Sequence, residues 1–251
     1  MSLRRVEATT YVTPLREGGS LPALVEADDD GLYVLKFRGA GQGRKALVAE
    51  VVAGELARAL GFLVPELVLA ELDPVLGRAE PDPEIQDLLV ASAGLNLGVD
   101  FLPAALPFSP AAGRAPDAGL AAAIVWLDAL VTNVDRTAQN PNLLWWHDRL
   151  WLIDHGASLY FHHAMPADPA HARNRFPAVR DHVLLPYASS IAAADDRLAE
   201  MVDDALLARI AAEIPDEWLD GDDRRIYVDY LHSRLESPRD FVEEAESARG
   251  R

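Results

Sequence analysis

The chain changes character at residues 103–116, a stretch rich in Pro, Gly and Ala, and this change constrains the fold more than any other feature. Before it, short β-rich runs alternate with turns rich in Gly and Asp, a pattern typical of a small antiparallel sheet. After it, most segments have the length and apolar periodicity of helices. The pattern predicts an α+β chain with a sheet-rich part at about 1–102 and a mainly helical part at about 103–251.

Turn residues and helix-ending residues set the expected element boundaries. The predicted strands are 9–15, 23–27, 32–37 and 68–72, followed by a small hairpin at 143–146 and 150–153. The predicted helices are 46–60, 84–92, 117–131, about 195–214, 222–235 and 238–247. Gly61 stands just after the first helix, where glycine commonly ends helices, and Pro65 lies a few residues beyond.

Composition excludes several classes of protein. A length of 251 residues suits one large domain or two closely packed lobes. The absence of cysteine rules out disulfides and thiolate sites, and it is consistent with the reducing cytoplasm, our predicted location. The formal net charge of −17 argues against nucleic acid as a partner, because phosphate binding needs a basic face. The longest uncharged apolar run, 118–127, is too short for a membrane span.

Two acids and an amide surround the predicted hairpin. Asp135 and Asn140 are five residues apart in the loop before it, and Asp154 follows its second strand, 19 residues after Asp135. Phosphoryl transfer needs one carboxylate to orient or accept the acceptor's proton, and an amide and a second carboxylate to hold Mg²⁺ against the phosphates. Asp135, Asn140 and Asp154 therefore supply the two carboxylates and the amide that this chemistry needs. Helix caps and turn closures are the competing interpretations of each residue taken singly.

Lysine is nearly absent: Lys36 and Lys45 are the only two among 23 basic residues. Lys36 lies in an apolar predicted strand, where an unpaired ammonium would be costly. A kinase-type site needs such a lysine on the phosphates of ATP and a helix glutamate to orient it. The following helix offers Glu50, on a face of small residues, and Glu55, among valines. The small neighbours favour Glu50, but helical geometry leaves the choice open.

A turn that covers the phosphates is the remaining part of such a site. Gly18, Gly19 and Ser20 lie between the first two predicted strands, and they are our candidates for this turn and for nucleotide binding. A glycine pair suits a plain hairpin equally well, so the structural interpretation stays open.

Three segments in combination resemble the HipA-like kinase family: VLKF…ALVAEVVAGELARALGFLVPE, TNVDRTAQNPNLLWW and LWLIDHG. They are more distantly similar to phosphoinositide kinases, which share the Asp-Arg-x-x-x-Asn loop and the later Asp-x-Gly. The similarity covers about residues 11–214. It implies a single kinase domain with a bilobal protein-kinase-like fold. A small antiparallel-sheet N-lobe with one helix and a mainly helical C-lobe would then bind ATP between them.

The resemblance also implies a role for each matching residue. Lys36 would contact the phosphates of ATP, and Glu50 would pair with Lys36. Asp135 would be the catalytic acid, and Asn140 and Asp154 would bind Mg²⁺.

The predicted activity is transfer of the γ-phosphate of ATP to a hydroxyl of a protein or small-molecule acceptor that the sequence does not identify. The acidic C-terminal part offers no basic surface for anionic lipid, which favours these two acceptor classes. Thr137 and His155 replace the residues usual in the family and leave substrate class and activation open. The alternative is a nucleotide-binding pseudokinase that acts as a scaffold or regulator. The presence of every charged group favours activity.

Overall fold

The computed structural model describes residues 2–15, 21–41, 43–164, 169–219, 221 and 223–250. The chain divides into two compact units. The first comprises Met1–Val48 and Pro65–Ala104, and the second comprises Ala49–Val64 and Ala105–Arg251. The α+β composition expected from the sequence is confirmed, with strands dominating the first unit and helices the second.

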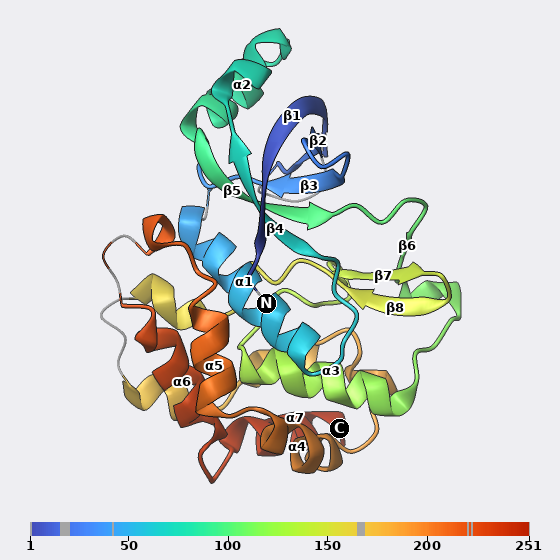
Figure 1. Cartoon of the computed structure of the whole chain (residues 1–251). Helices are drawn as coiled ribbons and strands as arrows, with labels where there is room; N and C mark the ends of the chain where they lie inside the picture. Colours follow the sequence, from blue (N-terminus) through green and yellow to red (C-terminus); the bar gives the residue numbers. More distant parts are fainter. Residues whose placement is uncertain are drawn as a thin grey trace. The chain divides into compact units, whose positions relative to one another are not determined.

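Five strands of the first unit close into a barrel in the order β1-β2-β3-β5-β4 (Figure 1). They are β1 (Arg4–Pro14), β2 (Ala23–Ala27), β3 (Leu32–Lys36), β4 (Leu67–Leu72) and β5 (Gly94–Asp100). Neighbouring strands are antiparallel except β1 and β4, which are parallel. The expectation of a purely antiparallel sheet is therefore corrected. The parallel pair closes the sheet and satisfies backbone groups that would otherwise form exposed edges.

Alternation along the strands gives the barrel an apolar interior. In β3, Tyr33 and Leu35 are buried in the hydrophobic core, whereas Lys36 on the opposite face is half-buried. The sequence pattern does not predict β5, because Gly98 interrupts it. A Cβ at Gly98 would lie 2.7 Å from Cγ2 of Val68, so only glycine allows these two strands to approach so closely.

Two helices accompany the barrel strands in the sequence. Helix α1 (Gly43–Ala59) ends just before Gly61, whose φ of +88° confirms the predicted stop. Helix α2 (Pro83–Ala91) begins at Asp82, whose side chain accepts a hydrogen bond from the Glu84 N–H. The boundary between the two compact units falls within α1, after residue 48.

A three-stranded sheet opens the second unit, in the order β6 (Leu106–Pro107), β7 (Leu143–Trp146) and β8 (Arg149–Leu152). The predicted hairpin is confirmed, and it turns at His147 and Asp148, which have φ angles of +47° and +58°. Two successive positive φ angles match the right-handed twist of the paired strands. The hairpin brings the ends of its two strands, and the loops that precede and follow them, close together (Figure 1).

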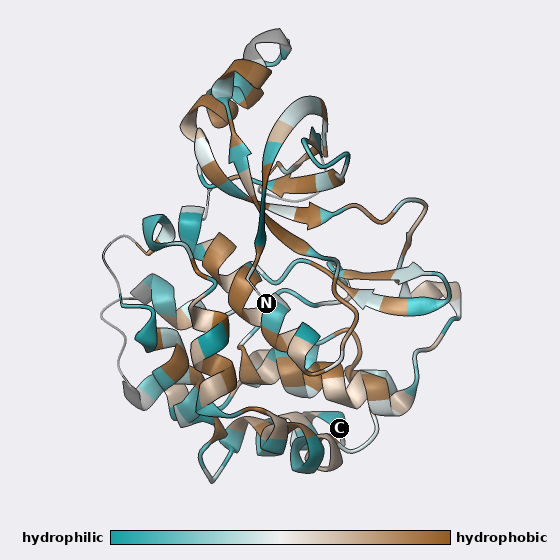
Figure 2. Cartoon of the chain, in the orientation of Figure 1, coloured by the Kyte–Doolittle hydropathy of each residue, from teal (hydrophilic) through white to brown (hydrophobic). Residues whose placement is uncertain are grey.

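Helix α3 (Ala118–Leu130) comes directly before the loop that leads to β7. This loop contains Asp135 and Asn140. Every residue from 121 to 130 is buried, including Asp128, and Figure 2 shows the helix mostly in the brown of apolar residues. A helix that is apolar on all sides is buried by its neighbours. Among the described residues, no helix combines the length and apolar character that a membrane crossing requires.

The remaining helices are α4 (Ile191–Leu198), α5 (Asp204–Ala211), α6 (Arg225–Leu235) and α7 (Asp240–Arg249). The prediction of one helix over about 195–214 is wrong, because the chain breaks between α4 and α5. Asp203 is extended there and caps α5 by accepting a hydrogen bond from the Leu206 N–H at 2.7 Å. Short 3₁₀ segments lie at Pro74–Ala79, Pro110–Ala112, Tyr160–Ala164, Pro169–Arg173, Pro177–Asp181, Leu185–Tyr187, Ala199–Met201 and Asp216–Trp218.

Candidate active site

The loop between α3 and β7 places Asp135 in direct contact with two amide side chains. Its Oδ2 accepts a hydrogen bond from Asn140 Nδ2 at 2.6 Å and another from Asn142 Nδ2 at 3.2 Å. Asp135 is half-buried, Asn140 is exposed and Asn142 is buried. The amide donors leave the other carboxylate oxygen, Oδ1, able to accept a further proton or hydrogen bond.

Thr137 explains why the chain between the two predicted site residues is compact. Its N–H is directed at the carbonyls of Asp135 (2.9 Å) and Asn140 (3.1 Å), and its Oγ1 accepts a hydrogen bond from the Asn140 N–H at 3.3 Å. These bonds close a tight turn around residues 135–140. The turn returns Asn140 to the carboxylate five residues earlier.

Asp154 lies just after β8 and in the same compact unit as Asp135. Its φ of +55° is a left-handed conformation that is uncommon for a residue other than glycine. Burial raises the pKa of Asp135, and the negative charge of Asp154 raises it further, against the lowering effect of the two amides and Arg136. The two carboxylates therefore lie close enough for their charges to interact. A carboxyl with a raised pKa is also a stronger proton acceptor.

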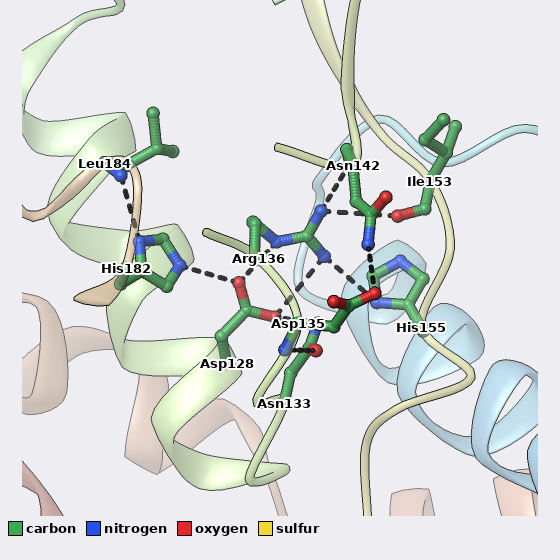
Figure 3. Close-up of polar contacts among 9 residues, drawn as sticks. All are labelled: Asp128, Asn133, Asp135, Arg136, Asn142, Ile153, His155, His182 and Leu184. Carbon is green, nitrogen blue, oxygen red and sulfur yellow. Dashed lines mark hydrogen bonds and ion pairs between the residues drawn. The ribbon is translucent and has the colours of Figure 1, made fainter. Parts of the chain in front are cut away.

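A cluster of buried charged and polar side chains supports this loop. We call it the loop network, and it comprises Asp128, Asn133, Arg136, Asn142, His155 and His182 (Figure 3). Arg136 is 1% exposed and donates from Nε to Asp128 Oδ2 at 2.5 Å. Its other nitrogens donate to the carbonyls of Asn142 and Ile153 and to Nδ1 of His155. One guanidinium thus connects α3 to both segments that carry the candidate site residues.

Asp128 is the acidic centre of the loop network and is fully buried. Burial by itself would raise the pKa of its carboxyl, but the charge of Arg136 and the hydrogen bond from His182 hold this pKa far below its ordinary value. Asp128 also accepts a hydrogen bond from Asn133 Nδ2 at 3.0 Å, and Asn133 Oδ1 accepts one from the Asp135 N–H at 3.1 Å. Asp128 is therefore ionised and tied to the backbone of the candidate catalytic residue.

Sequence reasoning did not predict the loop network, although the Asp-Arg motif contains Arg136 and His155 was noted as a departure from the family. One sequence feature would have indicated Asp128, because it is the sole charged residue in the apolar helix 118–130. No comparable feature marks His182, which lies 54 residues from Asp128 in sequence. Asn142 follows a proline just before the hairpin, where a turn interpretation was equally good.

Lys36 and Glu50 stand in different compact units. Lys36 is half-buried at the last residue of β3, in register with Leu97 of β5. Glu50 is 2% exposed within α1, whereas Glu55 is less buried and forms an ion pair with Arg58 at 3.4 Å. The deeper burial of Glu50 favours it as the partner of a cation, but its pairing with Lys36 stays a prediction.

The candidate phosphate turn of Gly18, Gly19 and Ser20 lies outside the described residues. On either side of it, the Leu15 N–H donates to the Pro22 carbonyl at 2.7 Å. The chain is therefore still paired where β1 and β2 approach this segment.

The donor set at the loop fits a hard divalent cation. Asn140 and Asp154 offer an amide oxygen and a carboxylate, the oxygen ligands that Mg²⁺ prefers. Across the part of the chain that the structure describes, no group of three or more His, Asp or Glu side chains could hold a metal ion alone. Mg²⁺ is commonly held by one or two protein oxygens together with substrate phosphates. The two residues therefore fit a metal that binds along with a nucleotide.

Two solved structures resemble this chain in fold. The structure of the Helicobacter pylori proinflammatory kinase CtkA aligns with a TM-score of 0.52 at 14% identity, covering 99% of this chain and 98% of that chain. The structure of the Golgi casein kinase with Mn/ADP bound aligns with a TM-score of 0.51 at 13% identity, covering 98% of this chain and 73% of that chain. At such identities the likeness establishes a kinase-like fold and nothing finer.

Comparison with curated proteins finds no match. A model of the HipA-like kinase family, by contrast, matches residues 9–240, which include every candidate site residue from Gly18 to Asp154. This match covers far more than half of the chain and agrees with the kinase-like fold. The chain belongs to the HipA-like kinase family.

Proposed function

We propose that this protein is a Mg²⁺- and ATP-dependent phosphotransferase that moves the γ-phosphate of ATP to a hydroxyl of a protein or small-molecule acceptor. The observation that carries the proposal is the arrangement around Asp135. Its carboxylate contacts Asn140 directly and interacts with the charge of Asp154. Family membership supports kinase chemistry. The structure of the Golgi casein kinase contains Mn and ADP, which supports a nucleotide and a divalent cation as cofactors of the present protein.

Asp135 would orient the acceptor hydroxyl and take its proton. Its raised pKa suits this task, because a base is most effective when its pKa approaches the working pH. The hydrogen bonds from Asn140 and Asn142 fix one carboxylate oxygen. The other oxygen would then face the hydroxyl in a defined direction.

Asn140 and Asp154 would hold the Mg²⁺ that neutralises the phosphate charge during transfer. Lys36 would bind the α- and β-phosphates, oriented by Glu50. Lys36 belongs to the barrel unit and the other groups to the helical unit. The proposal therefore includes the bilobal organisation expected from the family resemblance, with one kinase domain over residues 1–251.

The substitution Asp135→Asn tests this function most directly. Asparagine retains the size and hydrogen bonding of the side chain but cannot take a proton. Turnover should fall by about 10²–10⁴-fold, the usual contribution of a positioned acid–base group. The affinity for Mg²⁺·ATP should hold or rise slightly, because one negative charge near the phosphates is removed. ATP titration calorimetry and ADP release with and without Mg²⁺ provide the two measurements.

The matched control is Asp148→Asn at the tip of the β7–β8 hairpin. Asp148 is 94% exposed on its side chain and its left-handed backbone also suits asparagine, so rate and affinity should stay as in the wild type. Retained turnover in Asp135→Asn would contradict the catalytic assignment. A wild-type protein that binds ATP but releases no ADP would instead identify the pseudokinase alternative. Phosphoproteomics of a lysate treated with wild-type protein or Asp135→Ala would then identify the acceptor class.

A further inference from the structure

His182 forms one end of the loop network and lies 47 residues after Asp135 in the sequence. It follows the 3₁₀ segment Pro177–Asp181 and is 5% exposed. Its Nε2 lies 2.9 Å from Asp128 Oδ2, and the Leu184 N–H donates to its Nδ1 at 3.0 Å. A ring nitrogen that accepts a hydrogen bond carries no proton, so the proton of the neutral ring is on Nε2 and is donated to Asp128.

Two sets of hydrogen bonds connect Asp128, and so its contact with His182, to the candidate site residues (Figure 3). Through Asn133, Asp128 is connected to the Asp135 N–H. Through Arg136, it is connected to the carbonyls of Asn142 and Ile153. Asn142 contacts the Asp135 carboxylate, and Ile153 immediately precedes Asp154. The Val183 N–H also donates to the Arg136 carbonyl at 3.0 Å, which joins the His182 segment to the loop backbone.

A buried ion pair contributes little net stability, because desolvation offsets most of the attraction between the charges. Its more dependable consequence is geometric. Asp128 can satisfy Arg136 and His182 with one oxygen only when the 3₁₀ segment, the end of α3 and the loop are held in register. The same register sets where Asp135 and Asp154 lie relative to each other.

We propose that His182, Asp128 and Arg136 form a positioning chain for phosphoryl transfer, in which the hydrogen bond from His182 fixes the Asp128 carboxylate and thereby the placement of Asp135 and Asp154. This inference rests on the proposed function for its effect on rate. None of the three residues is a catalytic residue, since they act through Asp135 and Asp154. Groups of this kind typically change activity by about 10–100-fold when removed.

Two substitutions at His182 separate positioning from a local turn role. His182→Asn keeps an oxygen near the place of Nδ1, which can accept from Leu184, but it removes the donor to Asp128. His182→Gln keeps a donor near the place of Nε2 and loses the contact with Leu184. The positioning chain predicts that Asn lowers turnover by about 10–100-fold with the KM for ATP nearly unchanged, whereas Gln stays within a few-fold of the wild type.

The control is His171→Asn, which alters an exposed histidine of the same unit and should leave turnover unchanged. Equal turnover in wild type and His182→Asn, or a defect confined to His182→Gln, would overturn the positioning chain. Thermal unfolding of each variant shows whether it is folded at the assay temperature.

Hydrogen exchange provides a readout that does not depend on activity. The Asp135 amide, which donates to Asn133, should exchange faster in His182→Asn than in the wild type and should be restored in His182→Gln. A wild type without Mg²⁺·ATP turnover would refute the proposed function, and the exchange rates would still decide the positioning chain. Unchanged exchange of this amide in a folded His182→Asn protein would overturn it.

Discussion

The barrel and the loop network bury their residues by opposite means. The barrel core is apolar and is formed by alternating residues of paired strands, such as Val25, Leu35 and Val68. The loop network instead buries a carboxylate, a guanidinium and an imidazole in mutual contact. Apolar packing tolerates small rearrangements, whereas an ion pair in a low-dielectric interior demands fixed partners. From this difference we infer that apolar packing chiefly stabilises the barrel, whereas the ionic contacts of the loop network chiefly fix the positions of its residues.

The barrel has its own buried polar residue, and it sharpens the contrast. Asn96 is fully buried in β5; its Nδ2 donates to the carbonyls of Ser92 and Gly94, and its Oδ1 accepts from the Arg38 N–H. All three of these partners are backbone groups. The amide is neutral and satisfied, so it secures a loop without burying a charge.

The largest expected effect is that of Asp128→Ala. This change leaves the buried guanidinium of Arg136 without its carboxylate, which should lower the free energy of unfolding by about 3–5 kcal/mol. Urea unfolding followed by circular dichroism measures it. Asp229→Ala, an exposed change on α6, should stay within about 0.5 kcal/mol. A loss below about 1 kcal/mol for Asp128→Ala would show that the network does not bury its charges as described.

A cavity in the barrel should have the next largest effect. Leu35→Ala removes a fully buried side chain from the core and should cost about 2–5 kcal/mol in the same unfolding measurement. Val34→Ala, one residue away on the opposite face and half-buried, should cost clearly less. At a temperature where both variants are folded, their turnover per folded molecule should match. A selective loss of turnover in Leu35→Ala would break the division between stability and placement.

Lys36→Met should affect activity more than stability. Methionine replaces the half-buried ammonium with an apolar chain of similar length, so ATP binding or turnover should fall by an order of magnitude or more, about 1.4 kcal/mol. The partner of Lys36 follows from two further variants, because Glu50→Gln should reproduce the Lys36 defect and Glu55→Gln should not. The reverse result would assign the pairing to Glu55. Titration calorimetry and ADP release measure both quantities.

The smallest expected effect is a pH-dependent gain of stability in Asp135→Asn. A raised pKa means that folded Asp135 keeps its proton to a higher pH than the unfolded chain does. Wild-type stability therefore falls as the pH rises from the ordinary aspartate pKa through this raised value. The variant should unfold at a higher temperature than the wild type at neutral pH, and the difference should vanish below about pH 3.

The lowered pKa of Asp128 makes the stability of the fold depend on pH in the opposite direction. Its lowered pKa stabilises the fold above the ordinary aspartate range, and this contribution is lost as the pH falls toward and through the lowered value. Acid should therefore destabilise both the wild type and Asp135→Asn. Melting temperatures for the two proteins that differ equally at pH 3 and pH 7 would contradict the raised pKa of Asp135.

Several elements could be predicted from the sequence because local chemistry determines them. The bounds of β2 coincide with the predicted 23–27, since an aspartate-rich turn follows an alternating run. The first strand of the hairpin also coincides with the predicted 143–146. The stop of α1 follows from Gly61, whose left-handed backbone favours glycine over any other residue. Family membership likewise follows from motifs that lie within short segments.

The candidate site likewise has a part that local sequence predicted and a part that it did not. The spacing of Asp135 and Asn140 placed them in one loop, and their contact at 2.6 Å joins side chains only five positions apart. Their proposed chemical roles, and those of Lys36, Glu50 and Asp154, stay predictions. Asn142 could not be separated from a turn residue, because only the position of the Asp135 carboxylate gives its amide a partner.

By itself, the sequence determined the strands, helix ends and short motifs whose partners are a few residues away. Tertiary structure decided the parallel pairing of β1 with β4, the break at Asp203 and the burial of His182 against Asp128. Each of these depends on residues distant in sequence or on a choice between two locally acceptable conformations. A buried charge is tolerated only where such distant partners meet it, and local patterns contain no information about which partners those are.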